Sequence, residues 1–247
     1  MNQLEDKVAL VTGCALRIGR EIALGLAREG CDIVIHYKDS AEEADALAGE
    51  IREMGRQAWL VSGDLSNSYM PEVVMRTAWE LAGWVDILVN NAAMFSLMTL
   101  EEASVEEIEE LWHVNTLAPI IMAKTLASLA AVSEIIPDDY CGKVINILDR
   151  RISKPDRNCL PYWLTKKGLE AFTLGGALEL APRVIVNGVA PGPVLAPESS
   201  ELSEFAGPIP LAVRCLPSDI ADAVVYLARV VAVTGQILYV DSGQHLL

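Results

Sequence analysis

Short runs of β-branched and other apolar residues alternate with amphipathic segments along almost the whole chain. The apolar runs predict strands at residues 7–11, 32–36, 57–61, 87–89, 143–148, 184–189 and 237–240. Amphipathic segments such as 19–29, 41–54, 71–82 and 217–230 predict helices between them. Strands that are apolar at nearly every position are typical of a parallel sheet covered by helices on both faces. The pattern therefore predicts an α/β fold with a doubly wound parallel sheet of about seven strands.

No linker or repeat divides the sequence, so we interpret residues 1–247 as a single domain. One long irregular stretch, residues 191–216, breaks the alternation and contains five prolines: Pro191, Pro193, Pro197, Pro208 and Pro210. Loops of this length in compact domains are often lids or binding loops. Because the stretch follows the sixth strand at the edge where ligands bind in such folds, we interpret it as a substrate lid. A solvated surface loop is the alternative.

Composition and charge exclude several classes of protein. A net charge of −15 opposes binding to nucleic acid or to an anionic membrane, and no uninterrupted apolar run reaches the ~20 residues that span a bilayer. The polar, acidic N-terminus does not resemble a secretory or transit segment. The five cysteines form no Cys-x-x-Cys pair and the three histidines lie far apart, which favours reduced thiols and no metal site. We expect a cytoplasmic protein that binds a small molecule.

Tyr162 and Lys166 lie four residues apart in a predicted helical segment. Four residues make about one helical turn, so the two side chains would share a face. A lysine cation beside a phenol favours the phenolate and lowers the tyrosine pKa from its usual value of about 10. The pair therefore predicts a proton donor that works at physiological pH.

Asp149 lies thirteen residues before Tyr162, at the end of the apolar run Lys-Val-Ile-Asn-Ile-Leu. Its carboxylate is expected to emerge at the end of a buried strand, beside the tyrosine. A hydroxyl group there would suit carbonyl chemistry, whereas a carboxylate indicates a substrate rich in N–H groups. The structural alternative is that Asp149 caps a helix or pairs with Arg150 or Arg151.

The turn after the first strand has the composition of a phosphate-binding loop. Gly13 permits a tight turn out of the strand, and Gly19 allows the following helix to pack close to the sheet. The N–H groups at the start of that helix would face a pyrophosphate. Two glycines alone are a weak signal, but their place in an alternating α/β chain strengthens it.

Together these residues resemble the short-chain dehydrogenase/reductases along essentially the whole chain. The shared motifs are Thr12-Gly13-x-x-x-x-x-Gly19, Asp64 after the third strand, Asn90-Asn91-Ala92, Asn115, Tyr162-x-x-x-Lys166 and Asn187-x-x-x-Pro191-Gly192. The resemblance implies a Rossmann fold that binds a nicotinamide dinucleotide. It also implies a catalytic relay of Asn115, Tyr162 and Lys166, and a homotetramer.

Two features narrow the resemblance to the pteridine reductases and the related dihydromonapterin and dihydrofolate reductases. Arg17 replaces the middle glycine of the first motif, and Asp149 replaces the serine found in most members. Phe95 and His36-Tyr37 also fit this group. The resemblance assigns Arg17, Phe95, Asp149 and Tyr162 to the substrate, with Phe95 stacking on a pterin. From the sequence, Phe95 is equally compatible with a core position.

The same resemblance implies the cofactor-binding residues: Gly13, Arg17, Ile18, Gly19, His36, Tyr37, Lys38, Ser40, Asp64, Leu65, Asn91, Ala92, Tyr162, Lys166, Pro191, Gly192 and Val194. The second strand ends in His36-Tyr37-Lys38 rather than in the carboxylate of an NAD-type site. With Arg17 and Ser40, this end predicts charge-assisted hydrogen bonds to the 2′-phosphate of NADP(H). Asp39 opposes that preference, and Ala93 departs from the serine common in the subfamily.

The predicted function is NADPH-dependent reduction of a pterin-type substrate: a dihydropterin, dihydromonapterin or dihydrofolate. Asp149 and Tyr162 would supply the proton, and burial under a bound ring would favour a protonated carboxyl. The enzyme alternative is a carbonyl reductase for ketones or 3-oxoacyl groups, although an ionised Asp149 would repel a developing alkoxide. The non-enzyme alternative is a redox sensor that binds the nucleotide, but the intact Tyr162 and Lys166 argue against it.

Overall fold

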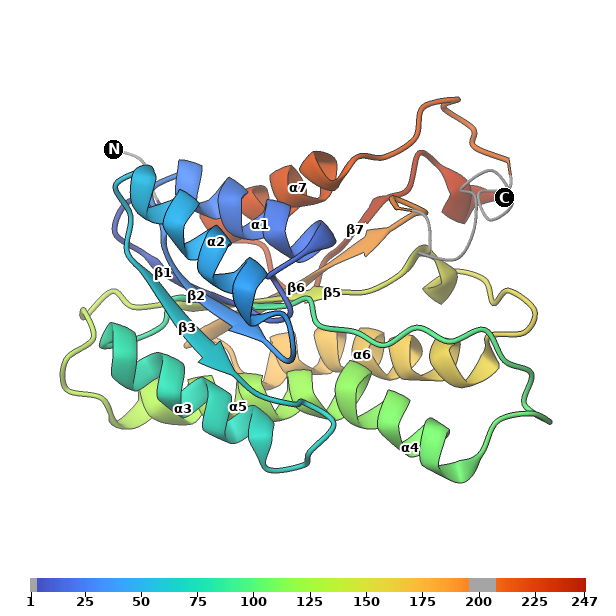
Figure 1. The fold of residues 1–247 in the computed structure, drawn as a ribbon, viewed down its shortest axis with the longest axis horizontal. Helices are drawn as coiled ribbons and strands as arrows, with labels where there is room; N and C mark the ends of the chain where they lie inside the picture. The colour runs from blue at the N-terminus through green and yellow to red at the C-terminus, as the bar shows by residue number, and fades with distance from the viewer. Residues whose placement is uncertain (1–3, 196–207) are drawn as a thin grey trace.

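A computed structural model of the chain describes residues 4–195 and 208–247, and its central feature is one seven-stranded sheet. The strand order is β3-β2-β1-β4-β5-β6-β7, and every neighbouring pair is parallel (Figure 1). The strands are β1 Val8–Val11, β2 Asp32–Tyr37, β3 Ala58–Ser62, β4 Ile87–Asn90, β5 Gly142–Ile147, β6 Val184–Pro191 and β7 Ile237–Val240. This arrangement confirms the predicted doubly wound Rossmann-like fold, and each strand ends within two residues of its predicted bounds.

Helices cover both faces of the sheet (Figure 1). They are α1 Arg17–Arg28, α2 Ala41–Glu53, α3 Met70–Ala82, α4 Val105–Trp112, α5 Ala118–Val132, α6 Leu160–Glu179 and α7 Pro217–Arg229. Helices α1, α2 and α7 lie on one face, and α3, α5 and α6 lie on the other. Alternate residues of β1 enter the two cores, because Ala9 packs into the first and Leu10 into the second. Burial on both faces explains why the strands are apolar at consecutive positions.

The direction of chain winding reverses between β1 and β4. From β1 the chain continues outward through β2 and β3, whereas β4 starts the opposite half of the sheet. Loops that leave adjacent strands in opposite directions open a crevice at the carboxyl ends, where ligands bind in such folds. The loop after β1 contains Gly13, and the loop after β4 contains Asn91 and Phe95. The fold therefore brings three predicted site residues to one crevice.

A continuous helical stretch, Val105–Val132, joins α4 and α5 through a π-helical segment at His113–Leu117. Ser104 caps its start, where Ser104 Oγ accepts from the Glu107 N–H and the Glu107 side chain accepts from the Ser104 N–H. By length and composition the stretch could span a membrane, but 56% of its most apolar 18-residue segment is buried inside the molecule. Helix α5 packs on α3 and the sheet, which is the environment of a core helix.

Most of the predicted lid lies outside the described residues, since 196–207 are not part of the structure described. Within the described parts, β6 extends to Pro191, and residues 208–216 form a turn and irregular chain up to α7. The lid stays a prediction.

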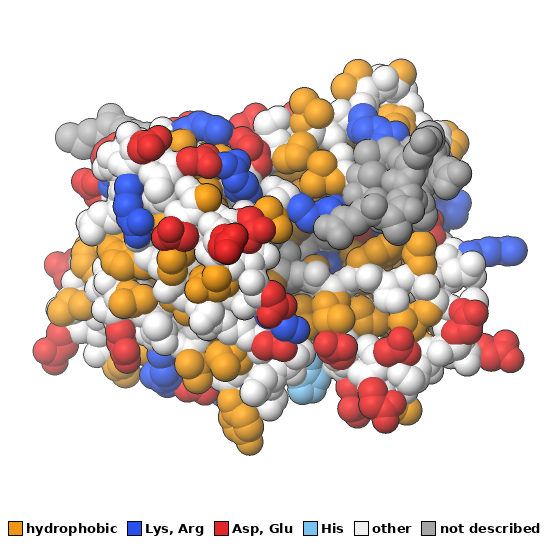
Figure 2. Space-filling view, viewed as in Figure 1, with side chains coloured by type: hydrophobic (Ala, Val, Ile, Leu, Met, Phe, Trp, Pro, Cys, Tyr) orange, Lys and Arg blue, Asp and Glu red, His pale blue; other side chains and the backbone are white. Residues whose placement is uncertain are grey.

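Acidic side chains are scattered over the helices on the face seen in Figure 2, with lysines and arginines among them, in keeping with the net charge of −15.

Candidate active site

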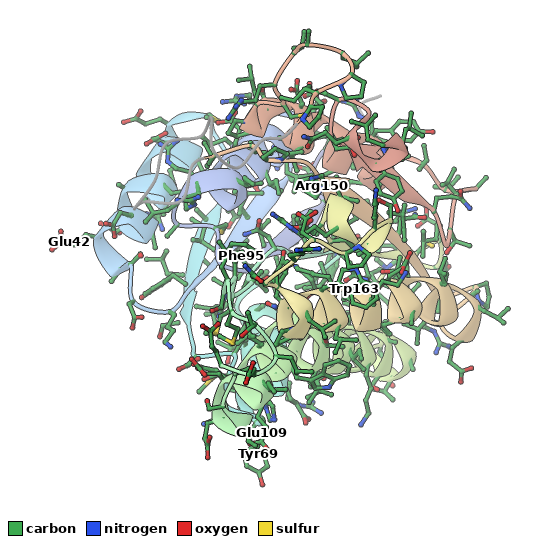
Figure 3. The ribbon with its side chains drawn as sticks, turned by 90° about the vertical axis from the view of Figure 1, so that its right-hand side faces the viewer. Glu42, Tyr69, Phe95, Glu109, Arg150 and Trp163 are labelled. Carbon is green, nitrogen blue, oxygen red and sulfur yellow. The ribbon has the colours of Figure 1, made fainter. Side chains whose placement is uncertain are left out.

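A cavity of about 490 Å³ opens at the carboxyl ends of the strands, at the point where the winding reverses. Its volume lies in the range of small-molecule sites, about 300–1,000 Å³. Figure 3 views the side of the molecule where the Phe95 loop, the turn with Arg150 and the start of α6 with Trp163 converge. The described residues that line the cavity are Gly13, Leu16, Arg17, Ile18, Gly19, His36, Lys38, Gly63, Asp64, Leu65, Asn91, Ala92, Ala93, Met94, Phe95, Val114, Ile147, Leu148, Asp149, Tyr162, Lys166, Pro191 and Gly192.

The loop after β1 leaves no room for side chains at its glycines. Gly13 has a φ of +59°, and a Cβ there would lie 3.1 Å from Ala92. A Cβ on Gly19 would lie 2.6 Å from the Gly13 carbonyl oxygen and would also clash with Asn91. The Asn91 side-chain amide donates to the carbonyl oxygens of Thr12 at 2.8 Å and Gly13 at 3.0 Å. These contacts hold the turn against β4 and leave the start of α1 open to a phosphate group.

Arg17 begins α1 and lines the cavity, as the resemblance implies. Its φ of +58° lies in the left-handed region, which costs a non-glycine residue roughly 1–2 kcal/mol. Backbone strain of this kind clusters at functional sites. Leu16, directly before it, is 44% exposed and also lines the cavity, although nothing in the sequence singled it out.

His36 connects two of the cavity loops. Its Nδ1 accepts a hydrogen bond from the Gly13 N–H at 3.1 Å, and its Nε2 lies 3.1 Å from the Gly63 carbonyl oxygen. Because Nδ1 accepts, the ring proton is assigned to Nε2, which donates to Gly63. Burial lowers the pKa of His36 to about 4, so the ring is neutral at physiological pH. His36 thus orients the loops and contributes no positive charge to a cofactor phosphate.

Lys38 and Asp64 form an ion pair at the same end of the cavity. Lys38 Nζ lies 2.8 Å from Asp64 Oδ2, and Asp64 Oδ1 accepts from the Ser66 N–H at 3.0 Å and from Ser66 Oγ at 2.8 Å. The hydrogen bond from Lys38 lowers the pKa of Asp64 to about 2. The cation that the sequence assigns to a 2′-phosphate is therefore shared with a carboxylate. Asp39 is exposed and is not one of the described lining residues.

Asp149 and Tyr162 meet at the opposite end of the cavity. Tyr162 Oη donates a hydrogen bond of 2.9 Å to Asp149 Oδ2, and the tyrosine is only 5% exposed. Asp149 also caps the short 3₁₀ turn Arg150–Ile152, where its Oδ1 accepts from the Arg151 N–H at 2.8 Å. Its Oδ2 accepts from Arg151 Nη1 at 3.0 Å. Asp149 therefore caps a helical turn and pairs with Arg151, as the structural alternative states, and the same carboxylate also faces Tyr162. Its catalytic role stays a prediction.

The predicted lowering of the Tyr162 pKa by Lys166 is wrong in this structure. Burial raises the pKa of Tyr162 well above 10, and the Asp149 carboxylate raises it further, while the Arg151 cation opposes these effects. Lys166 Nζ donates to the Ile147 carbonyl oxygen at 2.9 Å and lies 5.9 Å from the centre of the Tyr162 ring. Burial lowers the pKa of Lys166 to about 8. Sequence spacing predicted the shared face but could not predict the burial.

Asn115 lies in the π-helical segment and is fully buried. Its Oδ1 accepts from the Met94 N–H at 2.8 Å, and its Nδ2 donates to the Met94 carbonyl oxygen at 2.8 Å and to Thr165 Oγ1 at 3.0 Å. These three bonds join the loop after β4 to α6. Asn115 is not one of the described residues that line the cavity, so its place in a catalytic relay stays a prediction.

Phe95 lines the cavity, and its side chain is 45% exposed, which argues against a core position. Its ring lies 4.8 Å from the Tyr162 ring, nearly perpendicular to it. The guanidinium carbon of Arg151 lies 5.3 Å from the centre of the Phe95 ring. Arg151 Nε also bonds Asp156 at 2.7 Å, and Trp163 Nε1 donates to the Arg151 carbonyl oxygen at 2.8 Å. Phe95 is available for stacking at the end of the cavity that holds Asp149.

Three residues assigned to the cofactor by resemblance lie outside the described lining of the cavity: Tyr37, Ser40 and Val194. Val194 is buried in the core beneath α1 and α7, and Tyr37 packs against the same core. Ser40 stands just before α2. Conversely, the structure adds Leu16, Gly63, Met94, Val114, Ile147 and Leu148 to the lining. Their residue types are common in loops and cores, so the sequence had no signal to separate them.

Residues 7–206 match the protein family described as short chain dehydrogenase. An uncharacterized oxidoreductase of Mycobacterium tuberculosis is 34% identical over 255 residues, which cover 98% of this chain and 94% of that protein. A 3-oxoacyl-[acyl-carrier-protein] reductase of Synechocystis is 32% identical over 251 residues and 98% of each chain. Among solved structures, FolM alternative dihydrofolate reductase 1 of Brucella canis, complexed with NADP, has a TM-score of 0.91 and 30% identity, with 100% of this chain and 97% of that chain covered.

Proposed function

Since this chain belongs to the short-chain dehydrogenase family, we propose that it is an NADPH-dependent reductase of a pterin-type substrate. The substrate class comprises dihydropterins, dihydromonapterin and dihydrofolate. One observation carries the proposal: the Asp149 carboxylate lies 2.9 Å from Tyr162 Oη in a cavity that also presents Phe95. The structural similarity to the Brucella canis dihydrofolate reductase supports the same substrate class.

A carboxylate at this position suits a substrate with N–H donors. Asp149 accepts one hydrogen bond at Oδ1 and two at Oδ2, so a carboxylate with about four acceptor positions retains capacity for a substrate donor. A pterin offers ring N–H and exocyclic NH₂ groups to such an acceptor. A ketone offers only an oxygen, whose developing negative charge an ionised carboxylate would repel.

The cavity fits a nicotinamide dinucleotide. The close approach of backbone at Gly13 and Gly19 leaves a concave loop at the start of α1, and the same cavity is also lined by Tyr162 and Lys166. The lining residues proposed to hold the dinucleotide are Gly13, Arg17, Ile18, Gly19, His36, Lys38, Asp64, Leu65, Asn91, Ala92, Lys166, Pro191 and Gly192. When bound, NADPH supplies the hydride for the reduction.

Each catalytic side chain has a separate task in this proposal. Tyr162 is the proton donor to the substrate, and Asp149 holds the substrate edge and orients the Tyr162 hydroxyl. Lys166, held by the Ile147 carbonyl oxygen, lies beside the tyrosine ring and orients the ribose of the bound cofactor. Phe95 covers the flat face of the substrate, where stacking is worth roughly 0.5–1.5 kcal/mol beyond burial.

A 3-oxoacyl reductase is the second candidate, because the Synechocystis relative covers the same length at 32% identity. A substrate panel separates the two activities. NADPH consumption is followed by absorbance with dihydrobiopterin, dihydromonapterin, dihydrofolate and a 3-oxoacyl thioester. We expect turnover of at least one pterin and a much lower kcat/KM for the thioester. The opposite order would contradict the pterin proposal and favour the second candidate.

A further inference from the structure

Arg151 touches the catalytic carboxylate and the aromatic platform, yet it is not one of the described residues that line the cavity. Its Nη1 lies 3.0 Å from Asp149 Oδ2, its Nε lies 2.7 Å from Asp156 Oδ2, and its guanidinium lies over the Phe95 ring. The side chain is 16% exposed, so these contacts are partly shielded from water. Arg151 is therefore a charged group that contacts Asp149 and Phe95 from outside the described lining of the cavity.

The charge of Asp149 creates a difficulty for a proton donor beside it. Tyr162 Oη lies 2.9 Å from a carboxylate oxygen and is nearly fully buried. When Tyr162 loses its proton, a phenolate forms next to this carboxylate, and two like charges at that distance repel strongly in a shielded site. A cation paired with the same carboxylate reduces this repulsion. Arg151 is the cation in that position, and it acts on the pKa of Tyr162 in the opposite direction to Asp149.

We propose that Arg151 is a positioning residue that permits Tyr162 to release its proton, because it compensates the charge of Asp149. In this step the O–H bond of Tyr162 breaks and the proton passes to a ring nitrogen of the substrate, or to a carbonyl oxygen if the substrate is a ketone. The new N–H or O–H bond uses the electron pair that the C=N or C=O double bond releases when the hydride of NADPH reaches its carbon. The electron pair of the broken O–H bond stays on Tyr162 as a phenolate, which takes up a proton from the solvent before the next turnover. The inference rests on the proposed role of Tyr162 as donor, but not on the identity of the substrate.

The test compares three variants of the full-length enzyme. Arg151→Gln removes the charge, Arg151→Lys keeps a cation near Asp149 without the Nε contact to Asp156, and Arg150→Gln is the matched control. Arg150 also bonds Asp156, at 2.9 Å, but its guanidinium is directed to that residue rather than to Asp149. Each variant is assayed with whichever substrate of the panel the wild-type enzyme reduces. A panel without pterin turnover would thus contradict the proposed function while leaving this comparison intact.

We expect Arg151→Gln to lower kcat by about 10- to 100-fold, with less than about a threefold change in KM and in the NADPH Kd. Arg151→Lys should recover most of the lost kcat, and Arg150→Gln should stay within about threefold of wild type. The solvent deuterium isotope effect on kcat should increase in Arg151→Gln and, to a smaller extent, in Arg151→Lys, because proton release becomes slower.

Equal losses in Arg151→Gln and Arg150→Gln would overturn the inference, since the effect would then come from Asp156. So would an Arg151→Lys enzyme as slow as Arg151→Gln, or a solvent isotope effect that stays at the wild-type value in both Arg151 variants. Should Arg151→Gln fail to fold, the solvent isotope effect of Arg151→Lys against that of Arg150→Gln decides the matter alone. An isotope effect in Arg151→Lys that is no larger than in Arg150→Gln refutes the charge compensation.

Discussion

The neutral state of His36 should make the stability of the enzyme depend on pH in a defined window. Its two ring nitrogens bond Gly13 and Gly63, and protonation would turn Nδ1 from an acceptor into a donor that faces the Gly13 N–H. Burial lowers its pKa from 6.5 to about 4. Between these values the unfolded chain binds more protons than the folded protein, so the free energy of unfolding rises with pH. The contribution is complete above pH 6.5 and is lost as the pH falls through 4.

The size of this effect follows from the pKa displacement. At about 1.4 kcal/mol per pH unit, the change from 6.5 to about 4 corresponds to a total of about 3 kcal/mol. About 2 kcal/mol of it should be gone by pH 5. Other displaced groups titrate elsewhere: the pKa of Asp64 is about 2 and that of Lys166 about 8, so neither changes charge much between pH 5 and 6.5.

Urea unfolding followed by circular dichroism at pH 5.0 and 7.5 measures the effect, at one protein concentration throughout. When the pH is lowered from 7.5 to 5.0, we expect the free energy of unfolding of the wild-type enzyme to fall by about 2 kcal/mol more than that of a His36→Asn variant. Asparagine keeps an acceptor near the Gly13 N–H but cannot titrate. Equal losses in the wild type and His36→Asn would refute the reasoning.

Three further predictions concern activity. Asp149→Ala should lower pterin reduction by about 10²–10⁴-fold while the NADPH Kd, measured by fluorescence, stays nearly unchanged; a variant that binds NADPH weakly or unfolds would mean that the carboxylate is structural. Phe95→Leu should reduce kcat/KM for pterins by a few-fold to about tenfold and leave NADPH binding less affected. Unaltered pterin kinetics in the folded variant would exclude stacking. Arg17→Ala should weaken NADPH more than NADH, and a wild-type kcat/KM for NADH equal to that for NADPH would contradict the cofactor preference.

Much of the site was predictable because the chemistry depends on short spacings and on strand ends. The four-residue interval placed Tyr162 and Lys166 on one helix, and the apolar run before Asp149 placed its carboxylate at the edge of the sheet. The same reasoning placed Gly13 and Asn91 after neighbouring strands, at the point in the sheet where the direction of chain winding reverses. In each case the position follows from the local pattern together with the parallel arrangement of the strands, whose carboxyl ends meet at one edge.

Other properties of the site could not be inferred from spacing. Tyr162 is buried beside a carboxylate, which raises its pKa although Lys166 stands one turn away. His36 bridges Gly13 and Gly63 as a neutral ring, and the resemblance assigned it only to the cofactor. The side-chain amide of Asn115 is hydrogen-bonded to Met94 and Thr165, and no sequence pattern connects Asn115 to these two residues. These facts depend on residues that are distant in sequence and meet only in the folded molecule.

The amino-acid sequence by itself determined the doubly wound sheet, the approximate bounds of its strands and the edge of the sheet at which the site residues lie. Hydrophobic periodicity is a local property, and a strand apolar on both faces has few ways to be buried. The tertiary structure decided which charges touch, which groups lose water and which proton is held by which oxygen. Asp149 pairs with Arg151 and accepts from Tyr162 because the 3₁₀ turn Arg150–Ile152 and α6 pack together at one end of the cavity. Desolvation and charge interactions depend on every atom within several ångströms, and the chain brings those atoms together only when it folds.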